Sequence, residues 1–129
     1  DDLAILKRGE ALAALADLKA AGKVRAVGVS AASVAGAQWA IDHRSTSAPC
    51  DALMLTLNAA DTSMLSVITS AKAHNIGVLI KKPLASGHVT FDATAPHPIR
   101  AIINTPGVTS AIIGTAKPAH LNQAAAACH

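Results

Sequence analysis

Residues 51–82 read DALMLTLNAADTSMLSVITSAKAHNIGVLIKK, and this stretch decides the fold class. Its two ends, Ala52–Leu57 and Val78–Lys81, are apolar runs of the length typical of buried strands. Between them, apolar residues recur at helical spacing from Met64 to Ala71, after a predicted capping residue among positions 61–63. Two strands joined through a helix by short loops predict a right-handed crossover between parallel strands.

The alternation continues on both sides of this unit. Upstream, the pattern predicts a helix over Glu10–Ala21, a strand over Val24–Val29 and a helix capped by Ser33. Downstream, it predicts a helix over Ile99–Asn104, a strand over Val108–Ile113 and a helix that begins near Pro118. One helix followed by four strand–helix units is typical of half of a (β/α)8 barrel or of a small open α/β sheet. Periodicity alone does not separate the two.

Length and composition narrow the class of protein. The chain has 129 residues, of which 51% are hydrophobic and 15% charged, so it is too apolar to be disordered. A single domain, residues 1–129, is expected, although a closed (β/α)8 barrel needs about 250 residues. The start at Asp1 suggests a processed or truncated chain. The sequence has no apolar run of membrane-spanning length and no leader, which predicts a cytoplasmic protein.

Several kinds of site are disfavoured by the sequence. The net charge of +3 is mild and the basic residues are scattered, with only Trp39 and Phe91 as aromatics, which argues against nucleic acid. The six histidines form no metal-type pair, so no metal is expected. Cys50 and Cys128 do not form a disulfide framework. The sequence contains neither G-x-G-x-x-G nor a P-loop, and no G-x-S-x-G marks a nucleophilic serine.

Ligands of parallel α/β folds gather where the strands end. The four predicted strands end at Ser30, at Asn58, at 81–87 (KKPLASG) and at 114–117 (GTAK). The last two ends combine glycines, which let backbone approach a ligand, with lysines and a helix that begins just beyond Thr115. Backbone amides at a helix start favour phosphate, so these ends predict a nucleotide-phosphate site, with solvated loop lysines as the alternative.

Four segments resemble the aldo/keto reductase family in the same order and spacing. They are 18–30 (LKAAGKVRAVGVS), 51–58 (DALMLTLN), 77–87 (GVLIKKPLASG) and 106–121 (PGVTSAIIGTAKPAHL). Members of that family are (β/α)8 barrels that use NADPH, or less often NADH, to reduce aldehydes and ketones. The resemblance implies that this chain is the C-terminal half of the barrel, strands five to eight.

The resemblance also implies a cofactor site. Ser30 matches the serine that binds the nicotinamide carboxamide, and Lys81 stands where many members place an aromatic ring against the nicotinamide. Leu84 and Ser86 match residues at the pyrophosphate, and 114–117 falls in the loop around the 2′-phosphate. The complete set of expected cofactor-binding residues is Ser30, Asn58, Lys81, Pro83, Leu84, Ser86, Gly87, Gly114, Thr115, Lys117 and Gln123.

The sequence departs from the family pattern at the catalytic residues and at positions near the nicotinamide. The Asp, Tyr, Lys and His of the family's tetrad lie on the other half of the barrel, and this chain has no Tyr. Positions of the family's Asn, Gln and Tyr near the nicotinamide hold Ala31, Met54 and Leu57, and the family's final Glu-Asn pair reads Gln123-Ala124.

Three hypotheses follow from these matches and departures. The first is a carbonyl reductase of which this chain supplies the cofactor-binding half without catalytic residues. The second is a non-catalytic nucleotide-binding or assembly module, and the third is an unrelated α/β domain. A small carbonyl substrate is implied by the family. The missing half-barrel or a homo-oligomer is expected to cover the open edges.

Overall fold

The computed structural model describes residues 2–85 and 97–128. The strands are β1 (Gly28–Ser30), β2 (Ala52–Thr56), β3 (Gly77–Lys81) and β4 (Ser110–Ala111). The helices are α1 (Asp2–Arg8), α2 (Glu10–Ala20), α3 (Val34–Asp42), α4 (Leu65–Ala73), α5 (Pro98–Ile103) and α6 (Pro118–Ala126). None of the described helices is long and apolar enough to cross a membrane.

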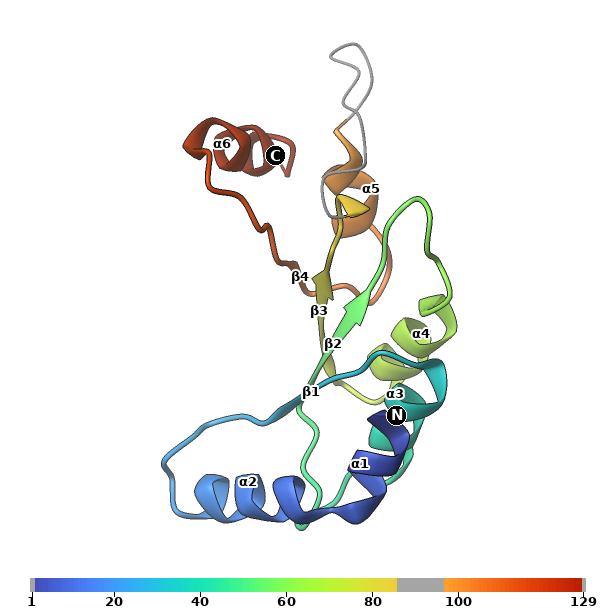
Figure 1. Cartoon of the computed structure of the whole chain (residues 1–129), viewed down its shortest axis with the longest axis vertical. Helices are drawn as coiled ribbons and strands as arrows, with labels where there is room; N and C mark the ends of the chain where they lie inside the picture. Colours follow the sequence, from blue (N-terminus) through green and yellow to red (C-terminus); the bar gives the residue numbers. More distant parts are fainter. Residues whose placement is uncertain (1, 86–96, 129) are drawn as a thin grey trace.

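All four strands are parallel, and they lie side by side in the order of the sequence, β1-β2-β3-β4. Helices α3 and α4 pack against each other on one side of this sheet (Figure 1). A doubly wound sheet reverses its strand order and carries helices on both faces. Strands in sequential order, with the crossover helices on one face, are the arrangement of consecutive strands in a (β/α)8 barrel. The structure therefore favours half of a barrel over a small open α/β sheet.

The burial of alternate strand residues defines the two faces of the sheet. Leu53 and Leu55 of β2 and Val78 and Ile80 of β3 are completely buried, because they face the helices. They meet a core of apolar residues from α3 and α4 that includes Ile41, Ala37, Val67, Ile68 and Ala71. The intervening strand residues point to the opposite face and are half-buried or exposed. In a closed barrel, that opposite face would line the interior.

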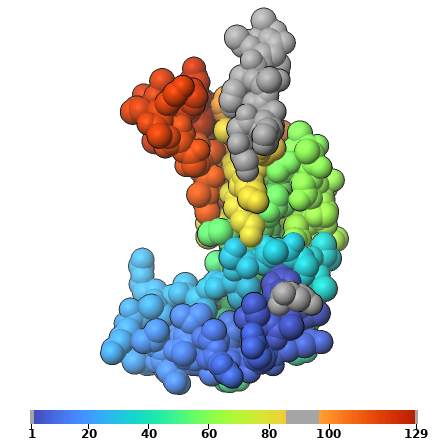
Figure 2. Space-filling model, in the orientation of Figure 1, coloured from blue at the N-terminus to red at the C-terminus, as the bar shows by residue number. Residues whose placement is uncertain are grey.

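The two ends of the chain lie far apart. In the space-filling view, α1 and α2 form one end of the molecule, and α6 lies at the other end (Figure 2). Within the described residues, β1 and β4 each pair with a single neighbour, so both are edges of the sheet.

The structure corrects the sequence prediction in four places. The strand predicted over Val24–Val29 begins only at Gly28, because the backbone N–H of Val27 donates to the Asp51 carboxylate (2.8 Å) and not to a neighbouring strand. The strand predicted over Val108–Ile113 shortens to β4, which has β3 as its one described neighbour.

The other two corrections concern helices. The predicted cap of α4 at 61–63 is wrong: the Asp61 carboxylate accepts from the amide and hydroxyl of Ser63, and α4 begins after Met64 without a side-chain cap. Helix α1 was not expected. By contrast, the Ser33 cap of α3 is confirmed, since its Oγ accepts from the amide of Gly36 at 3.0 Å.

A substitution at Gly107 tests how closely the turn before β4 packs against α4. Its φ of +103° lies in a region that side chains disfavour, and an added Cβ would lie 3.0 Å from both the Cγ2 and the carbonyl oxygen of Ile68. We therefore expect Gly107→Ala to lower the free energy of unfolding by about 1–3 kcal/mol in urea titrations. Gly9→Ala is the control, because Gly9 also has a positive φ (+75°) but open space around it. Equal losses in the two variants would show that crowding against Ile68 contributes nothing.

Candidate functional site

Ser30 and Lys81 come together at the carboxyl end of the sheet. Ser30 ends β1 and Lys81 ends β3, with β2 between them. The Lys81 Nζ donates to the Oγ of Ser30 at 3.1 Å and to the carbonyl oxygen of Ala31 at 3.0 Å. Both side chains lie on the face opposite the helices, because Val29 and Ile80, their neighbours along the strands, are buried against the core. Two residues that are 51 positions apart thus form one polar pair at the edge where ligands bind in parallel α/β folds.

Asn58 has a different environment. It is 5% exposed, and each polar atom of its side chain is engaged within the chain. Its Nδ2 donates to the carbonyl oxygen of Lys82 at 3.1 Å, and its Oδ1 accepts from the amides of Ala60 and Asp61 at 2.9 and 3.0 Å. The amide therefore ties the loop after β2 to the end of β3. This occupancy supports a structural role for Asn58 in shaping the site.

The backbone after β3 is strained. Lys82 and Ala85 have φ values of +55° and +46°, which side-chain-bearing residues adopt at a cost. The carbonyl oxygen of Lys82 holds this turn by accepting from the amide of Ala85 at 3.0 Å as well as from Asn58. Pro83 is buried and Leu84 is half-buried in the turn. Ser86 and Gly87 of the expected site lie outside the described residues. Strain of this kind clusters where a fold positions groups for binding.

The fourth strand leads into a second polar turn. An added Cβ at Gly114 would meet no atom within 4 Å, so its backbone is open to close approach. The amide of Lys117 donates to the Oγ1 of Thr115 at 3.1 Å, which shapes the turn just before α6. Helix α6 starts with Pro118, which has no amide proton, and no side chain caps it. The carbonyl oxygen of Lys117 accepts from the amides of His120 and Leu121 at 3.0 and 3.4 Å, so the start of α6 contributes mainly its N-terminal dipole. Lys117 and Gln123 are exposed.

A nicotinamide nucleotide has an amide at one end and phosphates towards the other. The Ser30–Lys81 pair supplies hydrogen-bond donors and a positive charge. The open backbone at Gly114 and the uncapped start of α6 suit a phosphate. The residues present therefore fit such a group. Among the described residues, no group of three or more His, Cys, Asp or Glu side chains is arranged to hold a metal ion.

The larger of two notable cavities, about 550 Å³, lies at the opposite end of the sheet. Its lining includes Lys19, Arg44, Cys50, Asp51 and His74. The basic groups in it are engaged: Lys19 pairs with Asp51, with its Nζ 2.6 Å from Oδ2, and the Arg44 Nη1 donates to the His74 carbonyl oxygen at the end of α4 (2.6 Å). Burial raises the pKa of the Cys50 thiol to about 11, so it is protonated at neutral pH. The amino ends of barrel strands serve stability, and these contacts support that role.

Sequence reasoning missed Asp2. Its carboxylate accepts from the amides of Ala32 and Ser33, both at 2.9 Å, and from the Ser33 hydroxyl at 2.7 Å. The Ser33 hydroxyl is the main reason that the pKa of Asp2 falls to about 2. Asp2 thereby fixes the loop that follows Ser30, from 30 residues away. No local pattern signals such a contact, because α1 and α3 meet only in the folded chain.

Comparisons with known proteins identify the family of the chain. The family model described as "Aldo/keto reductase family" matches residues 4–100. Two solved structures from Pseudomonas aeruginosa, each described as a candidate aldo-keto reductase, are 36% identical to the chain and have TM-scores of 0.79. They match 98% of this chain but only 46% and 45% of their own chains. No curated protein sequence gives a significant match.

The chain therefore belongs to the aldo/keto reductase family. It spans about half the length of the two solved relatives, and its parallel sheet with helices corresponds to part of a TIM barrel.

Proposed function

We propose that this protein is a reductase of aldehydes or ketones that uses NADPH, with NADH as the less favoured alternative. In this proposal, residues 1–129 form a single half-barrel that contributes much of the cofactor site and no catalytic residue. The observation that carries the proposal is the Ser30–Lys81 donor pair at the carboxyl end of a family-typical parallel sheet. It lies where the fold positions ligands, and its donors suit a carboxamide oxygen.

A bound nicotinamide nucleotide would supply the hydride. Ser30 and Lys81 would hold its carboxamide end, while the turn from Gly114 to Lys117 and the start of α6 would hold phosphate. Lys117 is the residue that favours a 2′-phosphate, and hence NADPH over NADH. The chain contains no Tyr, so the family's usual proton donor must come from outside these residues.

The test combines binding with turnover. Titration of the chain with NADPH and NADH, followed by heat or by Trp39 fluorescence, should show binding that favours NADPH. Reduction of a simple aldehyde should be absent with the chain alone. It should appear when residues 1–129 form part of a complete barrel. Absence of turnover from such a complete barrel would reject the reductase proposal.

A second candidate is a nucleotide-binding module that has lost the chemistry. The lack of any Tyr, together with Ala31 and Met54 at positions near the nicotinamide, favours it. The same experiment separates the two: NADPH binding without turnover, even from a complete barrel, would support the second candidate.

Gly114 provides a specific prediction. Because a Cβ there meets nothing within 4 Å and no positive φ requires glycine, the fold does not need Gly114. If a nucleotide phosphate approaches this backbone, Gly114→Ala should leave the urea midpoint unchanged and weaken NADPH binding by about tenfold. An unaltered NADPH affinity would place the phosphate elsewhere.

The open edges of the sheet indicate that this half-barrel associates with another protein surface. Edge strands and an uncovered inner face favour association, so we expect the chain to pair with another half-barrel, either the remainder of the reductase fold or a second copy. Size-exclusion chromatography should therefore show association. A stable monomer at micromolar concentration would contradict this expectation.

A further inference from the structure

We propose that Lys81 is a positioning residue that holds the Ser30 hydroxyl by a hydrogen bond and favours a ligand with a negatively charged acceptor group at that point. The inference rests on the proposed function for the identity of the nucleotide. It begins with the hydrogen bonds of the two side chains, both of which are accessible: Ser30 is exposed and Lys81 is half-buried.

The first step concerns the hydroxyl of Ser30. An ammonium group only donates hydrogen bonds, so the Oγ of Ser30 must accept from Lys81. A hydroxyl has one proton, and no acceptor for it is found among the described residues. With one lone pair engaged by Lys81, the Ser30 proton is free to donate to a ligand. The pair therefore offers a ligand the Ser30 proton as a donor, beside the one lone pair of the Oγ that Lys81 leaves open.

The second step concerns the charge of Lys81. Two of its three N–H groups donate to Ser30 and to the carbonyl oxygen of Ala31. The third N–H group has no hydrogen-bond partner within the described part of the chain. In that part, the lysine that forms an ion pair is Lys19, with Asp51. The site thus combines two free donors with one positive charge that no described carboxylate neutralises. A carboxylate offers two acceptor oxygens and a negative charge, so it matches this set better than a neutral amide.

The third step concerns order. Lys81 crosses β2 and is held at both the side chain of Ser30 and the backbone of Ala31, whose own amide donates to the Met54 carbonyl oxygen at 3.1 Å. A lysine that is fixed before the ligand arrives loses less side-chain entropy on binding. Lys81 therefore prepares the end of β1 for the ligand.

The test compares two nucleotides that differ at one group. NADP⁺ carries a carboxamide on its pyridine ring, and nicotinic acid adenine dinucleotide phosphate carries a carboxylate there. At low ionic strength, we expect the chain to bind the carboxylate nucleotide about tenfold more tightly. Lys81→Met keeps the length of the side chain but removes its donors and charge, so it should abolish this preference. Lys81→Arg should retain most of it.

Two controls separate positioning from a structural role. Ser30→Ala should weaken both nucleotides about equally, because it removes a donor but no charge. If Lys81→Met weakens both nucleotides by the same factor and leaves their ratio unchanged, Lys81 only supports the fold and the inference is overturned.

A second measurement keeps the inference distinct from the proposed function. If neither nucleotide binds, the proposed cofactor use by this chain fails. Nicotinate and nicotinamide are then titrated while the amide signals of Ser30 and Ala31 are followed by NMR. Larger shifts with nicotinate, lost in Lys81→Met, would support the inference without the nucleotide. Equal shifts, or none with either compound, would overturn it.

Discussion

Leu55→Ala should cost about 2–5 kcal/mol of unfolding free energy, which is a large share of the total for a domain of this size. Leu55 of β2 is completely buried, and its side chain packs in the core between the sheet and the helices. Truncation removes apolar contacts and leaves a cavity that a close-packed core does not refill. Urea titration followed by circular dichroism measures the loss.

Leu65→Ala is the matched control for this prediction. Leu65 lies in α4 and is 42% exposed, so the same chemical change removes little buried surface. We expect its cost to stay below about 1 kcal/mol. Similar losses for the two variants would mean that the helix-facing side of β2 is not the core of the protein.

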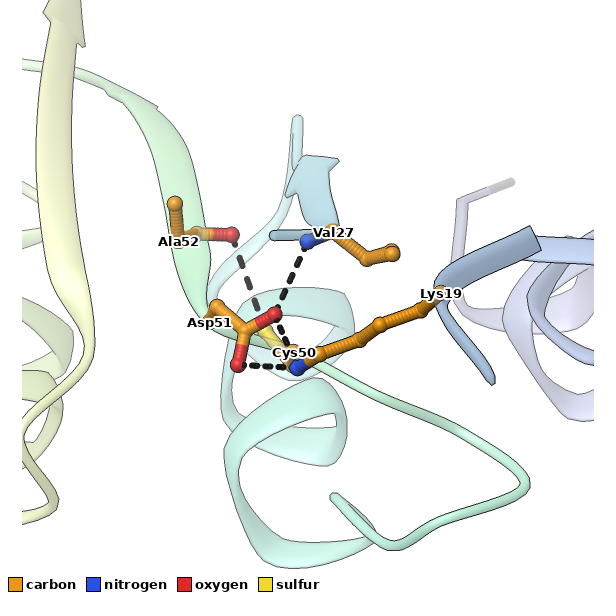
Figure 3. A network of polar contacts seen from close by, with 5 residues as sticks. All are labelled: Lys19, Val27, Cys50, Asp51 and Ala52. Carbon is orange, nitrogen blue, oxygen red and sulfur yellow. Dashed lines mark hydrogen bonds and ion pairs between the residues drawn. The ribbon is translucent and has the colours of Figure 1, made fainter. Parts of the chain in front are cut away.

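Asp51→Asn should give a smaller effect than Leu55→Ala, and its effect should depend on pH. The Asp51 carboxylate accepts from the Lys19 Nζ at 2.6 and 2.8 Å and from the buried backbone amide of Val27 at 2.8 Å (Figure 3). It therefore joins the end of α2 and the entry to β1 to the start of β2. The ion pair is more than one-third exposed and adds little, while the Val27 contact is worth about 1 kcal/mol.

The pH dependence follows from the pKa of Asp51. The hydrogen bond from Lys19, followed by that from the Val27 amide, lowers the pKa of this carboxyl below 3.8 in the folded chain. Its ionised form thus stabilises the fold fully above that ordinary value, and the contribution is lost as the pH falls through the lower folded-state value. Urea titrations of wild type and Asp51→Asn should differ at pH 7 and converge in strong acid.

Asp17→Asn serves as the control for Asp51. Asp17 is an exposed carboxylate on the same helix as Lys19, and the substitution makes the same change of charge. It should change the unfolding free energy at pH 7 by less than about 0.5 kcal/mol. A difference between wild type and Asp51→Asn that persists unchanged into strong acid would show that ionisation of Asp51 does not stabilise the fold.

The sequence predicts which residues stand at the strand ends, and hence which residues form the candidate site. Ser30 and Lys81 each follow an apolar run, and a parallel sheet brings such ends to one edge. Their hydrogen bond was not predictable, because it depends on a lysine that crosses an intervening strand. Asn58, like Ser30, follows an apolar run in the sequence, yet the polar atoms of its side chain all form hydrogen bonds with the backbone of the neighbouring loops. The sequence pattern identifies a polar residue at a strand end but not the partners that occupy it.

The sequence by itself determined the alternation of strands and helices, the parallel class of the sheet and the family. These features depend on local periodicity and on four short motifs, which neighbouring residues encode. Only the tertiary structure decided that the strands run in sequential order with α3 and α4 on one face, that Asp51 ends the pairing of β1 at Gly28, and that Asp2 holds the loop after Ser30. The last two features join residues 24 and 30 positions apart, and such contacts form only when the chain has folded.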